Sequence, residues 1–202
     1  MTTTTQLTQT QLTRTSLVRK QPKRRNAEKS RANILAAAQK VFSELGYAHA
    51  GIRDIAAIAD VSSTLLIRYF GSKAGLFEAA LIDAMKIDAL LTNGKEGFGE
   101  HLAKLFLNRN LDIPPPSMIA LATNHPEARE ITTRVIEEHI LPPFIKWLGA
   151  PDARARALQI TLLSTGFVQY TRQLPDLFAT RGADKKLAKW FAQSVQAIVD
   201  QS

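Results

Sequence analysis

Several absences exclude whole classes of protein before any motif is considered. The 202-residue sequence has no cysteine, which excludes disulfide scaffolds and thiol chemistry and suits a reducing cytoplasm. No apolar run reaches the roughly 18 residues that a membrane-spanning helix needs. Residues 1–20 are rich in Thr and Gln and lack the apolar stretch of a secretory signal peptide. We therefore expect a cytoplasmic protein with no membrane partner.

Strand-like patterns are also absent. No segment alternates apolar and polar residues between turn signals, which is the pattern of a half-buried strand. Hydrophobic residues make up 45% of the chain and aromatic residues only 7%, so a sizeable core must be built mainly from aliphatic residues. Ala and Leu dominate, and both favour helices. The composition therefore predicts an all-α fold of one medium-sized domain or two small ones.

Residue patterns typical of enzymes and metal sites are missing as well. There is no glycine-rich phosphate loop and no nucleophile elbow. The Glu-Glu-His sequence at 137–139 could suggest acid–base chemistry, but consecutive residues of a helix point to different faces, and a solvated charged surface explains them better. Neither HExxH nor another metal-ligand spacing connects the four histidines, which are His49, His101, His125 and His139. We expect no enzyme activity, no metal and no cofactor.

The positive charge is concentrated near the N-terminus. The whole chain carries a formal charge of +8, and residues 1–31 hold eight Lys or Arg against one Glu. A basic arm on a folded body is typical of nucleic-acid binding, although a tail that only aids solubility is the alternative. Residues 1–25 contain few large apolar residues, so we expect this arm to be disordered when free. Arg24 and Arg25 are its candidate contacts to the DNA backbone or an adjacent minor groove.

Residues 51–77 predict two short helices joined by a tight turn and followed by the start of another helix. The short helices are expected over about 52–59 and 63–70. Ser62 is a favourable N-cap for the second, and Ser72 for the helix that follows. Four apolar residues are spaced to pack the pair together, namely Ile55, Val61, Leu66 and Phe70. This is the pattern of a helix-turn-helix, whose second helix lies in the DNA major groove.

The opposite face of the second short helix carries groups that suit DNA. Ser63 and Thr64 provide hydroxyls for base edges or phosphates, and the alkyl group of Ile67 can touch a thymine methyl. Arg68 could pair with guanine or with phosphate. Lys73, at the start of the next helix, can clamp a phosphate together with the exposed amides there. An ordinary helical corner with a polar outer face is the alternative interpretation.

Further motifs lie between Ile34 and Leu81. They are Phe42 and Gly46-Tyr47, then Ile52-Arg53-Asp54-Ile55-Ala56, Val61-Ser62, Tyr69-Phe70-Gly71-Ser72-Lys73 and Leu76-Phe77. In combination these motifs resemble the TetR family of bacterial transcriptional regulators. The resemblance implies a three-helix DNA-binding module, a larger helical domain and a homodimer that reads a palindromic operator. Position by position, it implies that Ser63, Thr64 and Ile67 touch bases and that Arg68, Tyr69 and Lys73 touch phosphates.

Some positions depart from the family pattern. Ala50 and Gly51 stand where family members usually have Thr or Ser before the helix, which removes a phosphate contact and an N-cap worth about 1 kcal/mol. Thr64 replaces the Gly, and Ile67 the Tyr, that many members carry. Contacts through that tyrosine hydroxyl cannot form here. We therefore expect the docking mode of the family with a different base preference.

The chain is expected to divide into the arm at 1–25, a DNA-binding domain at 26–92 and a helical ligand-binding and dimerisation domain at 93–202. Helices near 152–173 and 184–200 are candidates for a dimeric four-helix bundle, which the resemblance also implies. Their apolar stripes would form the interface, unless these stripes are core within one chain. The stripes are Ala157, Ile160, Thr161, Ser164, Phe167 and Val168, and Leu187, Trp190, Phe191, Val195 and Ile198.

On the same resemblance, a ligand cavity is expected within about residues 98–170. Pockets combine apolar walls with a few polar anchors. The candidate wall residues, which ordinary core packing also explains, are Phe98, Leu102, Phe106, Met118, Leu121, Ile136, Phe144, Trp147, Ser164 and Phe167. The candidate polar anchors are His101, Thr123, His139 and Gln169.

The predicted function is a sequence-specific transcriptional regulator, with repression as the commoner role in the family. A small apolar or amphipathic effector would favour a conformer with badly spaced recognition helices, and the operator would then be released. The alternative is a nonspecific, architectural DNA-binding protein that relies on the basic arm.

Overall fold

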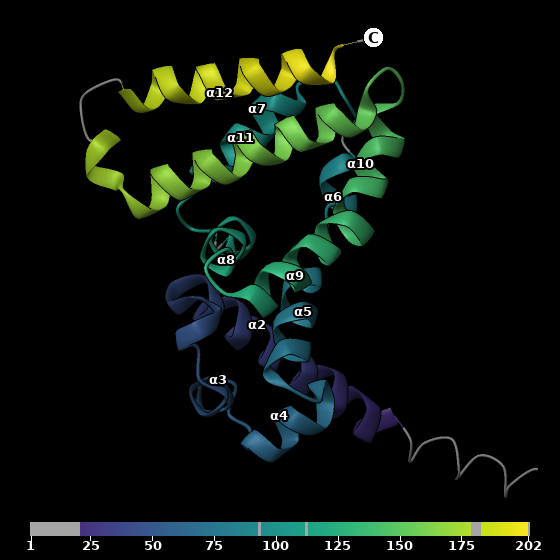
Figure 1. Ribbon diagram of the computed structural model, residues 1–202, viewed down its shortest axis with the longest axis vertical. Coiled ribbons are helices and arrows are strands. Elements are labelled where there is room, and N and C mark those ends of the chain that lie inside the picture. The colour runs from purple at the N-terminus through teal and green to yellow at the C-terminus, as the bar shows by residue number, and fades with distance from the viewer. Residues whose placement is uncertain (1–20, 93, 112, 179–182, 202) are drawn as a thin grey trace, which may run out of the picture.

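The computed structural model describes residues 21–92, 94–111, 113–178 and 183–201, with residues 21–25, 88–89, 178 and 183–184 described by their backbone only. Over these ranges the chain is helical and contains no strand, as the composition predicted. The elements are α2 (Gln21–His49), α3 (Ile52–Ile58), α4 (Ser63–Phe70), α5 (Lys73–Ala84), α6 (Asp88–Leu91), α7 (Phe98–Leu107), α8 (Pro114–Ala122), α9 (Pro126–Val135), η2 (Ile136–Ile140), α10 (Leu141–Leu148), α11 (Ala153–Gln173), η3 (Pro175–Phe178) and α12 (Ala183–Val199). Figure 1 shows an elongated molecule, with α3 and α4 at one end, α11 and α12 at the other, and α8 and α9 between them.

Apolar residues at helical spacing predict a first helix from about Ala27 to Leu45, ended by Gly46, and the structure makes this helix longer. α2 begins at Gln21 rather than near Ala27, so residues 21–25, which we expected in the disordered arm, are helical. Pro22 suits a first helical turn, and Gln, Lys and Arg favour helices. Residues 1–20 lie outside the described residues, so the disorder of the arm stays a prediction. At the other end, Gly46 has φ 71° and interrupts the helix where the sequence placed its end.

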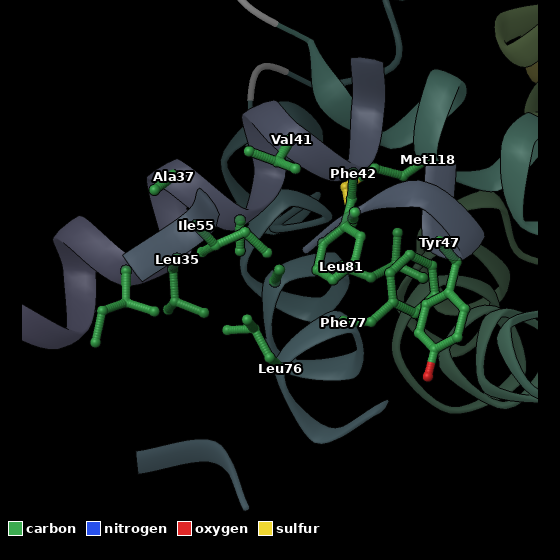
Figure 2. Packing of buried hydrophobic residues seen from close by; sticks show 14 of the residues in the cluster. Leu35, Ala37, Val41, Phe42, Tyr47, Ile55, Leu76, Phe77, Leu81 and Met118 are labelled. Atoms are coloured by element: carbon green, nitrogen blue, oxygen red, sulfur yellow. The ribbon is translucent and has the colours of Figure 1, made fainter. Parts of the chain in front are cut away.

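The first of two cores joins the predicted DNA-binding domain to helices from the second half of the chain. The rings of Phe42, Tyr47 and Phe77 meet at its centre, with centroid distances of 5.0, 5.2 and 6.1 Å. Figure 2 shows these rings beside Met118 of α8. The buried residues that α8 and α9 add to this core are Met118, Ala122, Ala128, Ile131 and Val135. The apolar interior therefore does not divide at residue 92, and the domain boundary there stays a prediction about folding units.

Close approach of α8 to α2 depends on Gly46. A Cβ atom at this position would lie 3.2 Å from the Cβ of Leu121, so a side chain there would force the two segments apart. The positive φ of Gly46 is also strained for any L side chain. The glycine that ends the regular part of α2 thus also sets how near α8 can pack.

The second core lies between α7, α10, α11 and α12. Phe106, Phe167 and Phe191 form its aromatic centre, and the last two rings stack with centroids 4.2 Å apart. Arg156 is fully buried at the far end of this core. Its guanidinium donates to the backbone carbonyls of Gly149, Pro151, Ile198 and Val199. One side chain thereby joins the end of α10 to the end of α12.

Pro126 is at a favoured first-turn position and predicts a long helix, but the structure divides this segment. α9 ends at Val135, a π-helical segment follows as η2, and α10 begins at Leu141. The sequence predicted a kink at Pro142-Pro143, but the irregular turn precedes the prolines. Each proline ring clashes with the carbonyl four residues earlier and offers it no N–H. The wider turn before the prolines accommodates both effects.

Candidate nucleic-acid interface and ligand cavity

The helix-turn-helix predicted from residues 51–77 is present as α3, a tight turn and α4. Ile55 and Leu66 are fully buried where the two helices meet, and Val61 and Phe70 pack partly buried against the same core. Because these anchors hold one side of α4 firmly, its other side projects from the end of the molecule (Figure 1).

Local hydrogen bonds fix the ends of these helices as the sequence predicted. Ser62 Oγ accepts from the Leu65 N–H at 3.1 Å and caps α4, while Ser72 Oγ accepts from the Gly75 N–H at 3.0 Å and caps α5. Asp60 has φ 54°, the left-handed conformation that turns the chain between α3 and α4. The turn therefore orients α4 by local chemistry before any partner binds.

The outer face of α4 carries the side chains predicted to contact bases. Thr64 and Arg68 are exposed, Ser63 is half-buried, and Ile67 exposes 40% of its surface. An exposed isoleucine beside hydroxyls and a guanidinium matches the mixed donor, acceptor and methyl pattern of a major groove. The DNA contacts of these residues stay predictions.

α3 begins without a side-chain cap, as expected from Ala50-Gly51. Gly51 is the N-cap residue and forms no side-chain hydrogen bond. The carboxylate of Asp54 folds back so closely that it occupies the space of a Cβ on Gly51. A carboxylate near the first turn is favoured by the helix dipole, so Asp54 partly replaces the missing cap.

Two residues predicted to touch phosphates are held by α2. The Tyr69 hydroxyl donates to Ala27 O at 3.3 Å, and Lys73 Nζ donates to Ala48 O at 3.2 Å. Lys73 Nζ also lies 4.8 Å from the ring centroid of Tyr47. Burial lowers the pKa of Lys73, and the charge of Glu127 opposes this. The ammonium group is thus preplaced at the edge of the helix-turn-helix.

The basic N-terminal segment lies next to the recognition helix. Arg24 and Arg25 fall in the first part of α2, but their side chains lie outside the described residues. Arg31, one turn or more further along, stacks its guanidinium 5.4 Å from the Phe70 ring centroid at the end of α4. The start of α2 therefore shares a surface with α4.

Tyr47 links this module to α9. Its hydroxyl donates to Glu127 Oε2 at 2.5 Å, and its ring centroid lies 4.7 Å from that of His125. Burial is the main cause that raises the pKa of Tyr47, and the hydrogen bond and charge of Glu127 raise it further. The sequence predicted Tyr47 as a family motif but offered no signal for its partner, which lies 80 residues away in the chain.

A cavity of about 200 Å³ lies where α5, α7, α8 and α11 meet. Its wall is almost wholly apolar, with hydroxyls only on α11. The residues that these helices contribute include Ala84 and Met85 from α5 and its end, Leu102, Leu105 and Phe106 from α7, Pro115, Pro116 and Ile119 from α8, and Ile160, Thr161, Ser164 and Thr165 from α11. The cavity therefore touches both the helix that follows α4 and a helix that packs on α2.

Only some of the residues predicted for the wall of a ligand cavity surround this one. Leu102, Phe106, Phe144 and Ser164 line the cavity, whereas the other predicted contacts lie elsewhere. Met118 faces the first core and Leu121 packs against Gly46. Phe167 stacks on Phe191, and Trp147 packs on Phe98 with centroids 4.7 Å apart.

The predicted polar anchors also lie outside the wall. His101 and His139 are exposed, because each falls on the outer side of its helix. Thr123 is exposed and Gln169 is half-buried, and neither lines the cavity. The hydroxyls of Thr161 and Thr165 were missed as anchors, although their spacing along α11 places them on one face with Ser164.

The stripes predicted for dimerisation are mostly core within one chain. The members that are buried are Ala157, Ile160, Phe167, Val168, Phe191 and Val195. The same two helices expose other apolar side chains: Leu158, Leu162 and Tyr170 on α11, and Trp190, which was in the predicted stripe. Leu162 is the most exposed of these, at 72% of its surface. Periodicity identified both helices but not which neighbouring stripe faces outward.

Membrane-spanning helices and metal-ligand clusters are both absent from the described part of the chain. None of its helices combines the length and hydropathy needed to span a membrane. Nowhere in the same ranges do three His, Asp or Glu side chains come together as a metal site would require.

Comparison with known proteins finds two family matches along the chain. Residues 34–80 match the family described as bacterial regulatory proteins, tetR family, and residues 96–199 match the tetracyclin repressor-like C-terminal domain. Over 55 residues the chain is 42% identical to the HTH-type transcriptional repressor NicS of Pseudomonas putida. That match covers 27% of this chain and spans about a quarter, 26%, of the relative's length.

Solved structures resemble the whole fold. A TetR-family transcriptional regulator from Rhodococcus sp. aligns with a TM-score of 0.64 at 19% identity, covering 84% of this chain and 99% of that one. NalD, the secondary repressor of the MexAB-OprM multidrug efflux pump in Pseudomonas aeruginosa, aligns with a TM-score of 0.57 at 19% identity, over 83% and 96% of the two chains. At such identities the likeness shows the fold. Together with the two family matches, it means that the chain belongs to the TetR family of bacterial transcriptional regulators.

Proposed function

We propose that this protein is a repressor that binds a palindromic operator as a homodimer and releases it when a small apolar or amphipathic molecule occupies the cavity. The observation that carries the proposal is α4, which is anchored by buried residues on one side and presents Thr64, Ile67 and Arg68 on the other. The relative NicS and the structural neighbour NalD are both repressors. A regulator of bacterial transcription works on the chromosome, so we place it in the cytoplasm.

DNA contacts follow from this arrangement. Ser63, Thr64 and Ile67 would read bases in the major groove, while Arg68, Tyr69 and Lys73 would hold phosphates on either side. Phosphate contacts fix the position of the protein and base contacts choose the sequence. Because Ile67 offers a methyl surface rather than a hydroxyl, we expect thymine methyl groups to be part of the preferred half-site.

The dimer supported by the exposed side chains uses α11 and α12. Leu158, Leu162, Tyr170 and Trp190 would be covered by the same residues of a second copy in a four-helix bundle. This face lies at the opposite end of the molecule from α4 (Figure 1). The two recognition helices would then meet successive major grooves, about one turn of DNA apart.

Ligand binding in the cavity would cause release of the operator through movement of α5 and α8. Met85, at the end of α5, lines the cavity, and the other end of α5 directly follows α4. A ligand that binds better to a conformer with shifted α5 changes the spacing of the recognition helices, and operator affinity falls by the same coupling factor. The effector and the operator bind at separate places, so the effect is allosteric.

Selection of bound sequences from a random DNA pool tests the proposal. A palindromic consensus with half-sites about one turn apart supports a sequence-reading dimer. Affinity that does not depend on sequence, measured by competition with random DNA, would instead support the architectural alternative. In the same assay, deletion of residues 1–25 should weaken binding and flatten its salt dependence if Arg24 and Arg25 contact phosphates. An unchanged slope would remove the arm from the interface.

A further inference from the structure

Among the residues that the structure describes, the cavity wall offers no free counter-charge for an ionised ligand. Lys86 is the only charged residue that these ranges contribute to the wall. Its ammonium group is hydrogen-bonded to Asp83, and its side chain is 72% exposed, so the charge is both paired and turned to solvent. An ionised group inside the apolar space would lose its hydration without a partner, which is costly.

The polar part of the wall consists of hydroxyls on adjacent turns of α11. Thr161 donates its hydroxyl hydrogen to Ala157 O at 2.9 Å. Ser164 and Thr165 form no side-chain hydrogen bond within the described ranges, although both are half-buried. Serine and threonine in a helix commonly bond the carbonyl one turn back. Two donors are therefore unused at one end of an apolar cavity.

The size of the cavity limits the ligand. An apolar protein cavity of roughly 150 Å³ takes a benzene molecule, and this one measures about 200 Å³. A single ring with a short substituent, or an aliphatic molecule of similar volume, fills it. The cavity is partly open, so a larger ligand would extend out of it into solvent.

We propose that the effector is a compact, uncharged and mostly apolar molecule with one hydrogen-bond acceptor, which binds the hydroxyls of Ser164 and Thr165. The proposal rests on the proposed function, since it names the ligand class of the same cavity. An ester, ketone or aldehyde on a single ring has this chemistry, whereas a carboxylate or an amine does not.

Four matched probes test this chemistry with the full chain: methyl benzoate, benzoate, benzylamine and ethylbenzene. Calorimetric titration and the thermal midpoint should both report binding of methyl benzoate, weaker binding of ethylbenzene and none of the two ionised probes. Benzoate binding as tightly as methyl benzoate would overturn the proposal and assign Lys86 to an anionic ligand. Failure of all four probes at millimolar concentration would overturn it as well.

Variants then test whether these two hydroxyls bind the hydrogen-bond acceptor of the ligand. The double variant Ser164→Ala with Thr165→Val should lower the affinity for methyl benzoate by about three- to tenfold and leave the affinity for ethylbenzene unchanged. Ser194→Ala on α12, outside the cavity wall, is the control and should change neither. Should the double variant unfold, Ser164→Ala alone carries the comparison. Equal loss for both probes, or no loss for either, would reject these hydroxyls.

The titrations contain no DNA, so the two proposals can fail separately. A protein that binds methyl benzoate but selects no operator would refute the proposed function and retain the ligand class. A protein that selects a palindromic operator but binds none of the four probes would refute the ligand class and retain the proposed function.

Discussion

The Tyr47 hydroxyl donates a 2.5 Å hydrogen bond to Glu127 Oε2, and this bond connects the end of α2 with the first turn of α9. The same tyrosine ring lies under the ammonium of Lys73, which is predicted to hold a phosphate. Only the side chains of Tyr47 and Glu127 therefore separate α9 from the predicted phosphate contact Lys73. Any displacement of α9 would be transmitted to the edge of the DNA-binding surface through contacts that are already in place.

Tyr47→Phe should destabilise the protein. The substitution removes the hydroxyl from a side chain that is 4% exposed and leaves Glu127 without this partner. A loss of about 1 kcal/mol is expected in the free energy of unfolding, measured in urea. Tyr170→Phe, on a side chain that is 55% exposed, is the matched control and should change little. Equal stability of the two variants would show that the Tyr47–Glu127 bond contributes nothing.

Alkaline pH should lower the free energy of unfolding of the parent protein more than that of Tyr47→Phe. Burial and Glu127 raise the pKa of Tyr47 above its ordinary value of 10.0, so the unfolded chain loses this proton while the folded chain retains it. The stabilisation is complete below about pH 10 and declines as the pH rises further. The difference in unfolding free energy between the parent and Tyr47→Phe should therefore shrink from pH 9 to about pH 11. A constant difference would contradict the raised pKa.

Lys73→Met should weaken binding to every DNA sequence. A charge-assisted bond to phosphate predicts a loss of about tenfold or more in operator affinity. The slope of log affinity against log salt should fall by about one unit, because one fewer counterion is released. Lys146→Met, an exposed lysine on α10, should alter neither quantity. A changed base preference, rather than uniform weakening, would place Lys73 at a base.

Arg156→Met should be severely destabilising. Arg156 is 1% exposed, and its bonds of 2.9–3.1 Å reach four carbonyls at the ends of α10 and α12 and the loop between α10 and α11. Methionine fills the space but leaves these acceptors without a donor, which predicts a loss of about 3 kcal/mol or more.

The matched control for Arg156 is two residues away. Arg154 pairs with Glu137 at 2.6 Å, but both side chains are about half exposed. Because solvent screens such pairs, Arg154→Met should leave the urea midpoint almost unchanged. Comparable losses of stability in the two variants would mean that the hydrogen bonds of buried Arg156 do not stabilise the junction of α10 and α12.

Leu162→Glu should convert the dimer to monomer. Leu162 exposes 72% of its surface within one chain, and the proposed interface would force the new carboxylate into an apolar contact. Sedimentation velocity at micromolar concentration measures the change, and far-UV circular dichroism confirms that the variant is folded. Leu45→Glu, on α2 and 50% exposed, should remain dimeric. A dimeric Leu162→Glu would move the interface away from this face of α11.

Much of the helix-turn-helix was predictable because its determinants are local. Ser62 and Ser72 cap helices within three residues of themselves, and Gly46 and Gly71 end helices through their own backbone conformation. Such signals need no knowledge of the rest of the chain. The start of α2 was wrong by several residues, because a polar, basic segment has no apolar periodicity to mark where the helix begins.

The larger helical domain that follows the helix-turn-helix was less predictable, because the contacts that determine its structure are long-range. The periodicity of α11 predicted a helix with one apolar stripe, but only packing decides that Ile160 of this stripe lines the cavity and that Leu162, outside the stripe, is exposed. His101 and His139 were plausible anchors by residue type, yet their helices are rotated so that both face away from the cavity. Rotating a helix by one residue position leaves its apolar periodicity unchanged but decides which side chains line a pocket.

Sequence alone determined the family, the all-helical class and the side of α4 that is left exposed, since capping residues, turn residues and apolar spacing act over a few positions. Tertiary structure alone decided that α8 and α9 complete the first core, that Tyr47 meets Glu127, and that Ser164 and Thr165 stand at the polar end of the cavity. These relationships join residues far apart in the chain. Their geometry follows from how whole helices pack, which no local pattern encodes.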